Sequence, residues 1–268
     1  MSRIPDKFAE LKVARKCGFI PFITAGDPDP STSVDIAVKL ADLGASVIEL
    51  GVPFSDPMAD GPTIQRSSMR ALEKGMNFSG VLEIAAAIRT RSDVPIVLFT
   101  YFNPLLKFGI DELCRFGTVI DGVLLTDVIE DEANAISNKL SEHGIDLISL
   151  VAPTTSDKRL PKICSKARGF IYAVSRTGVT GARTETADQA EFLVTRVRQF
   201  TDLPVAVGFG ISTSGQIGDV WRYAEAAVVG SAIVAEIEDA GPSGNAVERV
   251  EEFVKRLLPQ VAKTGSEN

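Results

Sequence analysis

Glu49 is the first residue whose type and position suggest chemistry. It lies in residues 46–50, a predicted strand in which alternation places its side chain opposite those of Ile48 and Leu50. If those two pack against helices, Glu49 points into an apolar interior. There its pKa rises from roughly 4.3 toward neutrality, which suits a general acid and base. The alternative is a structural glutamate that pairs with a buried arginine or caps a helix.

Asp60 is a second candidate carboxylate, in the loop that follows this strand. Residues 53–62 contain three prolines and two aspartates, and long restrained loops of this kind are usually functional. Asp60 is either catalytic or the N-cap of the next helix, whose first turn would contain Pro62. The spacing alone favours neither interpretation.

Glycines at the ends of two later predicted strands indicate a phosphate site. One strand leads into residues 208–212 and the next into residues 230–234. Backbone N–H groups approach an anion closely at glycine, and a short helix that begins at Ser231 would direct free N–H groups toward it. The alternative is that these glycines only form tight turns.

Other features narrow the reaction class. Residues 175–184 are polar, contain glycine and lack helical periodicity, so we interpret them as a mobile lid rather than an ordinary solvated loop. None of the predicted strands ends in a lysine, which argues against a Schiff-base aldolase. The sole histidine, His143, lies at the end of a predicted helix, which argues against a histidine-bound metal or a Ser-His-Asp triad. The remaining chemistry is metal-free carboxylate catalysis on a phosphorylated substrate.

These residues must be positioned by an alternation of strands and helices. Nearly continuous apolar runs, typical of strands buried on both faces, lie at residues 18–24, 46–50, 95–99, 122–126, 146–151, 169–174, 204–208 and 226–230. Amphipathic stretches that predict helices lie at residues 33–43, 131–143, 188–200 and 247–258.

Eight such strands predict an α/β fold, a single (β/α)8 TIM barrel over residues 1–268, with catalytic groups at the carboxyl ends of the strands. An extra helix at residues 4–16 would close the opposite end. The alternative is an open doubly wound sheet. Such a sheet usually carries a GxGxxG loop after its first strand, whereas this chain has Thr24-Ala25-Gly26-Asp27-Pro28.

Composition limits the partners and the compartment. The 268 residues are 45% hydrophobic and carry a net charge of −7, which argues against a nucleic acid or an anionic membrane as the main partner. The three cysteines are far apart, so we expect a reducing compartment. With no signal-peptide or transmembrane pattern, we expect a cytoplasmic protein.

Residues 48–65, Ile-Glu-Leu-Gly-Val-Pro-Phe-Ser-Asp-Pro-Met-Ala-Asp-Gly-Pro-Thr-Ile-Gln, closely resemble a signature of the tryptophan synthase alpha chain family. Further resemblances, in the family's order, cover residues 24–28, 101–104, 175–181, 208–212 and 230–234. One departure is Ile129, where the family usually has proline.

The resemblance implies a retro-aldol cleavage of indole-3-glycerol phosphate to indole and glyceraldehyde 3-phosphate. It implies that Asp60 holds the indole N1–H, that Glu49 serves C3 and the hydroxyl group, and that Thr180 contacts Asp60 once the lid is closed. The implied indole and glycerol pocket is Phe22, Phe99, Tyr101, Leu124 and Tyr172, and the implied phosphate contacts are Gly181, Phe209, Gly210, Gly230 and Ser231. The family has no cofactor in this chain, and its partner is a pyridoxal-phosphate-containing beta chain in an αββα heterotetramer.

Two other functions remain open at this stage. One is another phosphate-binding barrel enzyme, such as a sugar-phosphate epimerase or isomerase, and the other is a catalytically silent subunit that only activates a partner. Phe54, Pro57 and Met58 in the loop beside Asp60 predict a partner contact. The alternative is that this loop packs on its own barrel.

Overall fold

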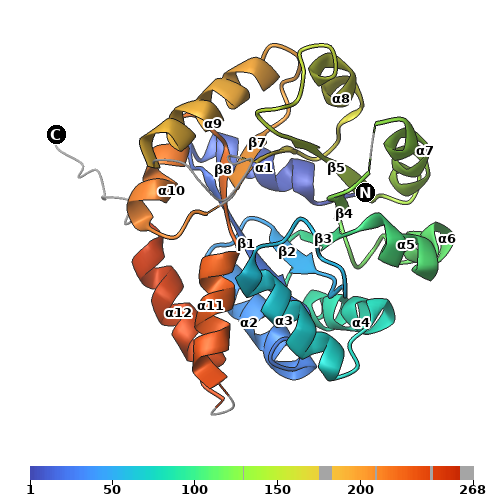
Figure 1. Ribbon diagram of the computed structural model, residues 1–268, viewed down its shortest axis with the longest axis vertical. Helices are drawn as coiled ribbons and strands as arrows, with labels where there is room; N and C mark the ends of the chain where they lie inside the picture. Colours follow the sequence, from blue (N-terminus) through green and yellow to red (C-terminus); the bar gives the residue numbers. More distant parts are fainter. Residues whose placement is uncertain (129, 175–182, 209, 242–243, 260–268) are drawn as a thin grey trace.

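The strands form a closed barrel, as predicted. The computed structural model describes residues 1–128, 130–174, 183–208, 210–241 and 244–259. Its eight parallel strands follow one another around the barrel in chain order, and β1 closes the barrel by pairing with β8 (Figure 1). They are β1 (Gly18–Thr24), β2 (Ile48–Gly51), β3 (Ile96–Thr100), β4 (Gly122–Leu125), β5 (Asp146–Val151), β6 (Ile171–Val174), β7 (Val205–Gly208) and β8 (Ala226–Val229).

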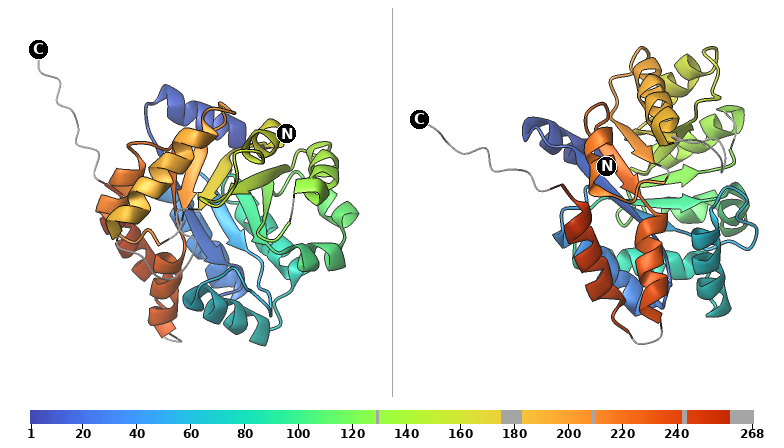
Figure 2. Two further views of the ribbon diagram at one scale, coloured as in Figure 1. Left: turned by 45° about the horizontal axis from the view of Figure 1, so that its top comes forward. Right: turned by 60° about the vertical axis from the view of Figure 1, so that its left-hand side comes forward.

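Helices cover the outside of this barrel (Figures 1 and 2). The predicted amphipathic helices correspond to α2 (Pro30–Asp42), α7 (Glu130–Ser141), α9 (Arg183–Val197) and α12 (Ala246–Leu257). The sequence analysis predicted only the starts of α3 (Pro62–Glu73) and α11 (Ser231–Ala240), and it assigned no element to α4 (Phe78–Arg89), α5 (Phe102–Phe108), α6 (Ile110–Cys114), α8 (Leu160–Lys166) or α10 (Ser214–Val220). In the described part of the chain, no helix is long and apolar enough to cross a bilayer.

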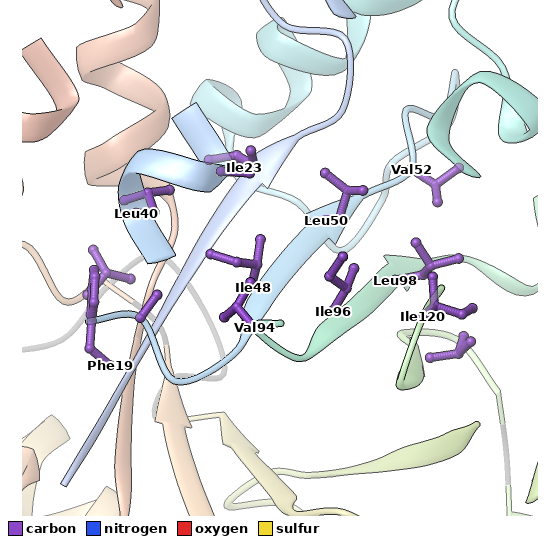
Figure 3. Packing of buried hydrophobic residues seen from close by; sticks show 14 of the residues in the cluster. Phe19, Ile23, Leu40, Ile48, Leu50, Val52, Val94, Ile96, Leu98 and Ile120 are labelled. Atoms are coloured by element: carbon purple, nitrogen blue, oxygen red, sulfur yellow. The ribbon is translucent and has the colours of Figure 1, made fainter. Parts of the chain in front are cut away.

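Alternate residues of each strand face opposite sides, and both sides are apolar. Ile48 and Leu50 of β2 lie beside Ile96 and Leu98 of β3, in the cluster between the strands and the helices (Figure 3). All four side chains are fully buried, and each contributes about 1.5–3 kcal/mol to the free energy of unfolding. Val97, which lies between Ile96 and Leu98, belongs to a second apolar cluster inside the barrel.

Helix α1 (Ile4–Val13) closes the amino-terminal end of the barrel. Its Ile4 and Phe8 are buried in the interior cluster, where the Phe8 ring lies 5.7 Å from that of Phe170. The helix ends at Val13, three residues earlier than predicted, because Arg15 adopts a left-handed backbone with φ of 53°. With this end plugged, the open mouth lies at the carboxyl ends of the strands.

Candidate active site

Glu49 lies inside the barrel, on the side of β2 that alternation predicted. Its neighbours in the strand register are Phe22 of β1 and Val97 of β3, while Ile48 and Leu50 pack outward beneath the helices. Only 1% of Glu49 is exposed. The parallel strands therefore hold a carboxyl group in a dry environment between rigid backbones.

The environment of Glu49 favours its neutral form. Among the described residues, none forms a hydrogen bond with its Oε1 atom. Burial raises the pKa of the Glu49 carboxyl to about 8, because removing water penalises the charged form. The structure does not support the alternative of a glutamate paired with a buried arginine, since no described cation forms an ion pair with it. Glu49 can therefore both donate and accept a proton near neutral pH.

Asp60 does not cap the helix that follows it. The N-cap of α3 is Gly61, and Pro62 occupies the first turn. The Asp60 carboxylate accepts a hydrogen bond from the Tyr101 hydroxyl instead, and that hydroxyl oxygen accepts the Ala59 N–H at 2.9 Å. Burial raises the pKa of Asp60 to about 6, and the hydrogen bond from Tyr101 partly opposes this shift. Asp60 is thus held in place as a carboxylate that ionises just below neutral pH.

Aromatic side chains line the space between these carboxylates. Phe22 and Phe99 meet edge to face, with ring centroids 5.3 Å apart. Tyr172 of β6 is buried, and this burial raises its pKa, as do the negative charges of Glu49 and Asp60. The Tyr172 hydroxyl group therefore lies close enough to both carboxylates to interact electrostatically with each. Leu124 of β4 is buried in the same interior cluster as Tyr172.

Two strand-end glycines make room for these rings. A Cβ atom at Gly51 would lie 2.5 Å from Cζ of Phe22, and one at Gly208 would lie 2.2 Å from Oη of Tyr172. The sequence analysis assigned Gly208 only to the phosphate turn and gave Gly51 no role of its own. The sequence shows each of them only as a glycine at the carboxyl end of a strand. That glycine is required there because an aromatic ring packs against it, and only the tertiary structure shows that ring.

The glycine turns after β7 and β8 present backbone groups at the mouth. Gly210 has φ of 74°, and a Cβ atom there would meet no atom within 4 Å. Gly230 is the N-cap of α11, and the first turn of this fully described helix holds no acidic residue. The N–H groups of Ser231 and Ala232 point out of the helix start, as at an anion site. Phe209, Thr180, Gly181 and the rest of the expected lid at residues 175–182 lie outside the described residues, as does Ile129.

The phosphate turn and the aromatic pocket adjoin each other. A Cβ atom built on Gly230 would lie 3.4 Å from Cβ of Phe22, and Phe22 is paired with Glu49 in the barrel. A ligand with a phosphate at one end and an aromatic ring at the other would therefore reach from α11 to the carboxylates.

The loop between β2 and α3 is partly packed and partly exposed. Phe54 lies against Tyr101, with ring centroids 5.2 Å apart, so this end of the loop packs on its own barrel. Met58 is 94% exposed, and Asp56 is exposed beside it. The loop thus offers a contact surface directly next to Asp60.

Known proteins resemble this chain over nearly its full length. A sequence model described as tryptophan synthase alpha chain matches residues 8–262. The tryptophan synthase alpha chain of Gluconacetobacter diazotrophicus is 45% identical, and the alignment covers 99% of this chain and 97% of that protein. The corresponding chain of Citrifermentans bemidjiense is 44% identical, with 98% and 99% covered.

Solved structures also resemble this chain over nearly its full length. Tryptophan synthase subunit alpha from Legionella pneumophila superposes with a TM-score of 0.87 at 33% identity, covering 96% of this chain and 97% of that one. A chain of the tryptophan synthase a2b2 complex from Pyrococcus furiosus superposes with a TM-score of 0.83 at 38% identity, covering 90% and 97%. The chain therefore belongs to the tryptophan synthase alpha chain family, carbon–carbon lyases that cleave indole-3-glycerol phosphate to indole and glyceraldehyde 3-phosphate in tryptophan biosynthesis.

Proposed function

We propose that Glu49 and Asp60 divide the proton transfers of this cleavage between them. The observation that carries the proposal is the pair of environments: Glu49 is buried with an unpartnered Oε1 atom, and Asp60 is held by the Tyr101 hydroxyl. The pKa of Glu49 is about 8 and that of Asp60 about 6, so at pH 7 the first is protonated and the second is ionised. Two carboxyl groups with separated pKa values are suited to opposite roles.

Glu49 donates its proton to indole C3, which converts the ring to an indolenine with positive charge at N1. The Asp60 carboxylate accepts a hydrogen bond from N1–H and stabilises that charge. The Glu49 carboxylate then removes the proton of the hydroxyl group on the side chain's first carbon. The bond from C3 to that carbon breaks, its electron pair returns to the ring, and the carbon becomes the aldehyde of glyceraldehyde 3-phosphate. Glu49 ends protonated, ready for the next turnover.

Turnover is expected to follow a bell-shaped pH profile. Asp60 must be ionised, so kcat should rise with pH through about 6, and Glu49 must be protonated, so kcat should fall above about 8. The measurement is kcat at saturating indole-3-glycerol phosphate, because ionisation of the free substrate's phosphate then does not enter. A kcat that stays level from pH 5 to pH 9 would contradict the assigned roles.

The phosphate of the substrate is proposed to bind at the turns after β7 and β8. The first observation is the left-handed backbone of Gly210, with open space beside it. The second is the start of α11 at Gly230 and Ser231, where no described side chain accepts a hydrogen bond from the N–H groups of the first turn. A phosphate there accepts hydrogen bonds from backbone N–H groups, and the positive end of the helix dipole attracts its charge.

Replacing Gly230 by valine should raise KM for indole-3-glycerol phosphate by roughly tenfold or more, because the side chain blocks the N–H groups of α11. Gly230→Ala is the matched control for folding, since its Cβ would make an ordinary contact with Phe22. An unchanged KM in both variants, or a phosphate seen elsewhere in ligand-bound crystals, would refute this site.

A partner beta chain is proposed to contact the β2–α3 loop. The alpha chain family carries no cofactor, and the pyridoxal phosphate of tryptophan synthase belongs to the beta chain. We propose that this chain forms an αββα complex of that kind, with Met58 and Asp56 at the contact. The Asp60 N–H donates a hydrogen bond to the Pro57 carbonyl oxygen at 3.0 Å. A partner that shifts the backbone at Pro57 would therefore also shift Asp60.

Adding a cognate beta chain should activate indole-3-glycerol phosphate cleavage, by about 5- to 150-fold for a typical coupling energy. Asp56→Ala and Pro57→Gly should each weaken this activation, because they alter the exposed loop and its backbone. Asp219→Ala is the control, since Asp219 is an exposed carboxylate on α10 paired only with Arg222 in the described structure. Equal activation of all variants would contradict the proposed role of the loop. A lack of activation of the unaltered chain would contradict the proposed beta-chain partner.

A further inference from the structure

A group of charged side chains joins three elements behind the candidate site. Arg70 of α3 donates through Nε and Nη2 to the two carboxylate oxygens of Asp27, at 2.8 and 2.7 Å, and through Nη1 to Oε1 of Glu238 at 2.8 Å. Arg66, one turn earlier, donates to both oxygens of Glu238, each at 2.7 Å. We name these four residues the Arg70 bracket.

The bracket is well defined geometrically. Asp27 follows β1 and its side chain is 1% exposed, so its pair with Arg70 is shielded from water. Two-pronged arginine–carboxylate pairs fix orientation as well as distance. Glu238 lies on α11 and is held by two arginines of α3, so the two helices are joined twice. They are neighbours in the fold, as Figure 1 shows.

Further hydrogen bonds fix α3 against the end of β1. The Thr24 and Ser67 hydroxyl groups lie 2.6 Å apart and are buried. Lys74 donates to the carbonyl oxygen of Pro28. Together with the Asp27–Arg70 pair, these contacts fasten α3 along its length to the segment that follows β1.

The bracket joins the two helices that begin at opposite ends of the substrate. Helix α3 starts immediately after Asp60, and α11 starts at the phosphate turn. Phe22, Phe99, Leu124 and Tyr172 of the aromatic pocket, in contrast, lie on β1, β3, β4 and β6, which belong to the closed barrel. Movement of α3 relative to α11 would therefore act first on Asp60, which lies just before α3, while these four residues are held by the strands of the barrel.

We propose that Arg70 is a positioning residue for the cleavage reaction, fixing Asp60 at a set separation from the phosphate-binding start of α11. The proposal rests on the roles of Asp60 and α11 given under Proposed function. Because the same substrate is held at both ends, a misplacement of Asp60 by about 1 Å can cost up to ~10²-fold in rate. Arg70 acts through α3 and touches no reacting atom.

The test uses the full chain and the variant Glu238→Gln, which removes the negative charge and one acceptor oxygen from the connection between α3 and α11 but leaves the Asp27–Arg70 pair intact. We expect kcat for indole-3-glycerol phosphate to fall roughly three- to tenfold, with KM unchanged. Binding of glycerol 3-phosphate, measured by calorimetry, should also be unchanged. Arg70→Lys, which keeps a cation for Asp27 but loses the two-pronged pair, should lower kcat further.

Glu251→Gln is the matched control. Glu251 also lies between two cations, Lys39 of α2 and Lys255 of α12, and is 26% exposed against 27% for Glu238. It does not touch α3, so its variant should retain the kcat of the unaltered chain. Thermal unfolding of each variant shows whether it is folded at the assay temperature.

The proposal is overturned if Glu238→Gln retains full kcat or loses no more than Glu251→Gln. It is also overturned if KM and glycerol 3-phosphate binding weaken instead of kcat, since the bracket would then shape only the phosphate site. If Arg70→Lys fails to fold, the kcat and KM of Glu238→Gln alone test the proposal. If Asp60→Asn is inactive and Glu238→Gln is normal, only the proposed role of the Arg70 bracket is contradicted. If Asp60→Asn is active, the proposed role of Asp60 itself is contradicted.

Discussion

Turnover of indole-3-glycerol phosphate is expected to fall at least ~10²-fold when Glu49 is replaced by glutamine. The amide has nearly the same shape, but it can neither give a proton to C3 nor take one from the hydroxyl group. The phosphate turns and the aromatic pocket are unaltered, so glycerol 3-phosphate should bind normally. The measurement is single-turnover cleavage together with calorimetric binding, and near-normal turnover would reject the assignment.

Loss of folding does not explain this expected loss, because the substitution should stabilise the protein at alkaline pH. The pKa of Glu49 is raised in the folded chain to about 8, so the native state holds this proton more tightly than the unfolded chain. The stability contributed by that proton is fully present below about 4.5 and is lost as pH rises through about 8. The stability of Glu49→Gln relative to the unaltered chain should therefore increase between these pH values and stay higher above pH 8, which denaturant unfolding at pH 5 and pH 8.5 can measure.

Replacing Asp60 by asparagine should also lower turnover by roughly 10²-fold, the scale for removing one electrostatic stabiliser of a transition state. The amide is neutral and cannot balance the positive charge that develops at N1. The hydrogen bond from Tyr101 to position 60 can still form, so the loop should keep its conformation. Retained turnover in Asp60→Asn would return this residue to a structural role.

Tyr101→Phe provides a graded comparison for Asp60. It removes the hydrogen bond that lowers the pKa of Asp60 and the acceptor of the Ala59 N–H. The acid side of the pH profile should therefore move upward from about 6, with a smaller loss of kcat than in Asp60→Asn. An unshifted acid side would show that another group titrates there.

The barrel could be predicted because its signals are local. Apolar runs such as those of β1 and β5 recur along the chain, and both strands begin and end where the sequence analysis placed them. The orientation of Glu49 followed from the same periodicity, since successive side chains of a strand face opposite sides. The end of α1 was wrong by three residues, because the left-handed backbone of Arg15 leaves no clear signal in the sequence.

The role of Asp60 needed tertiary structure. Its sequence neighbours fit a helix cap as well as a catalytic group, and the choice depended on Gly61 taking the cap and on Tyr101, about 40 residues away, binding the carboxylate. The roles of Gly51 and Gly208 depended likewise on which aromatic ring lies over each of them.

The sequence by itself determined the barrel, the inward direction of Glu49 and the glycine turns at the mouth, because strand periodicity and backbone freedom act over a few neighbouring residues. Only the tertiary structure decided the partners: Tyr101 for Asp60, and Asp27 and Glu238 for Arg70, the latter separated by 168 positions. Such pairs form where the closed barrel brings distant elements together, and for Asp60 burial in that structure then raises the pKa.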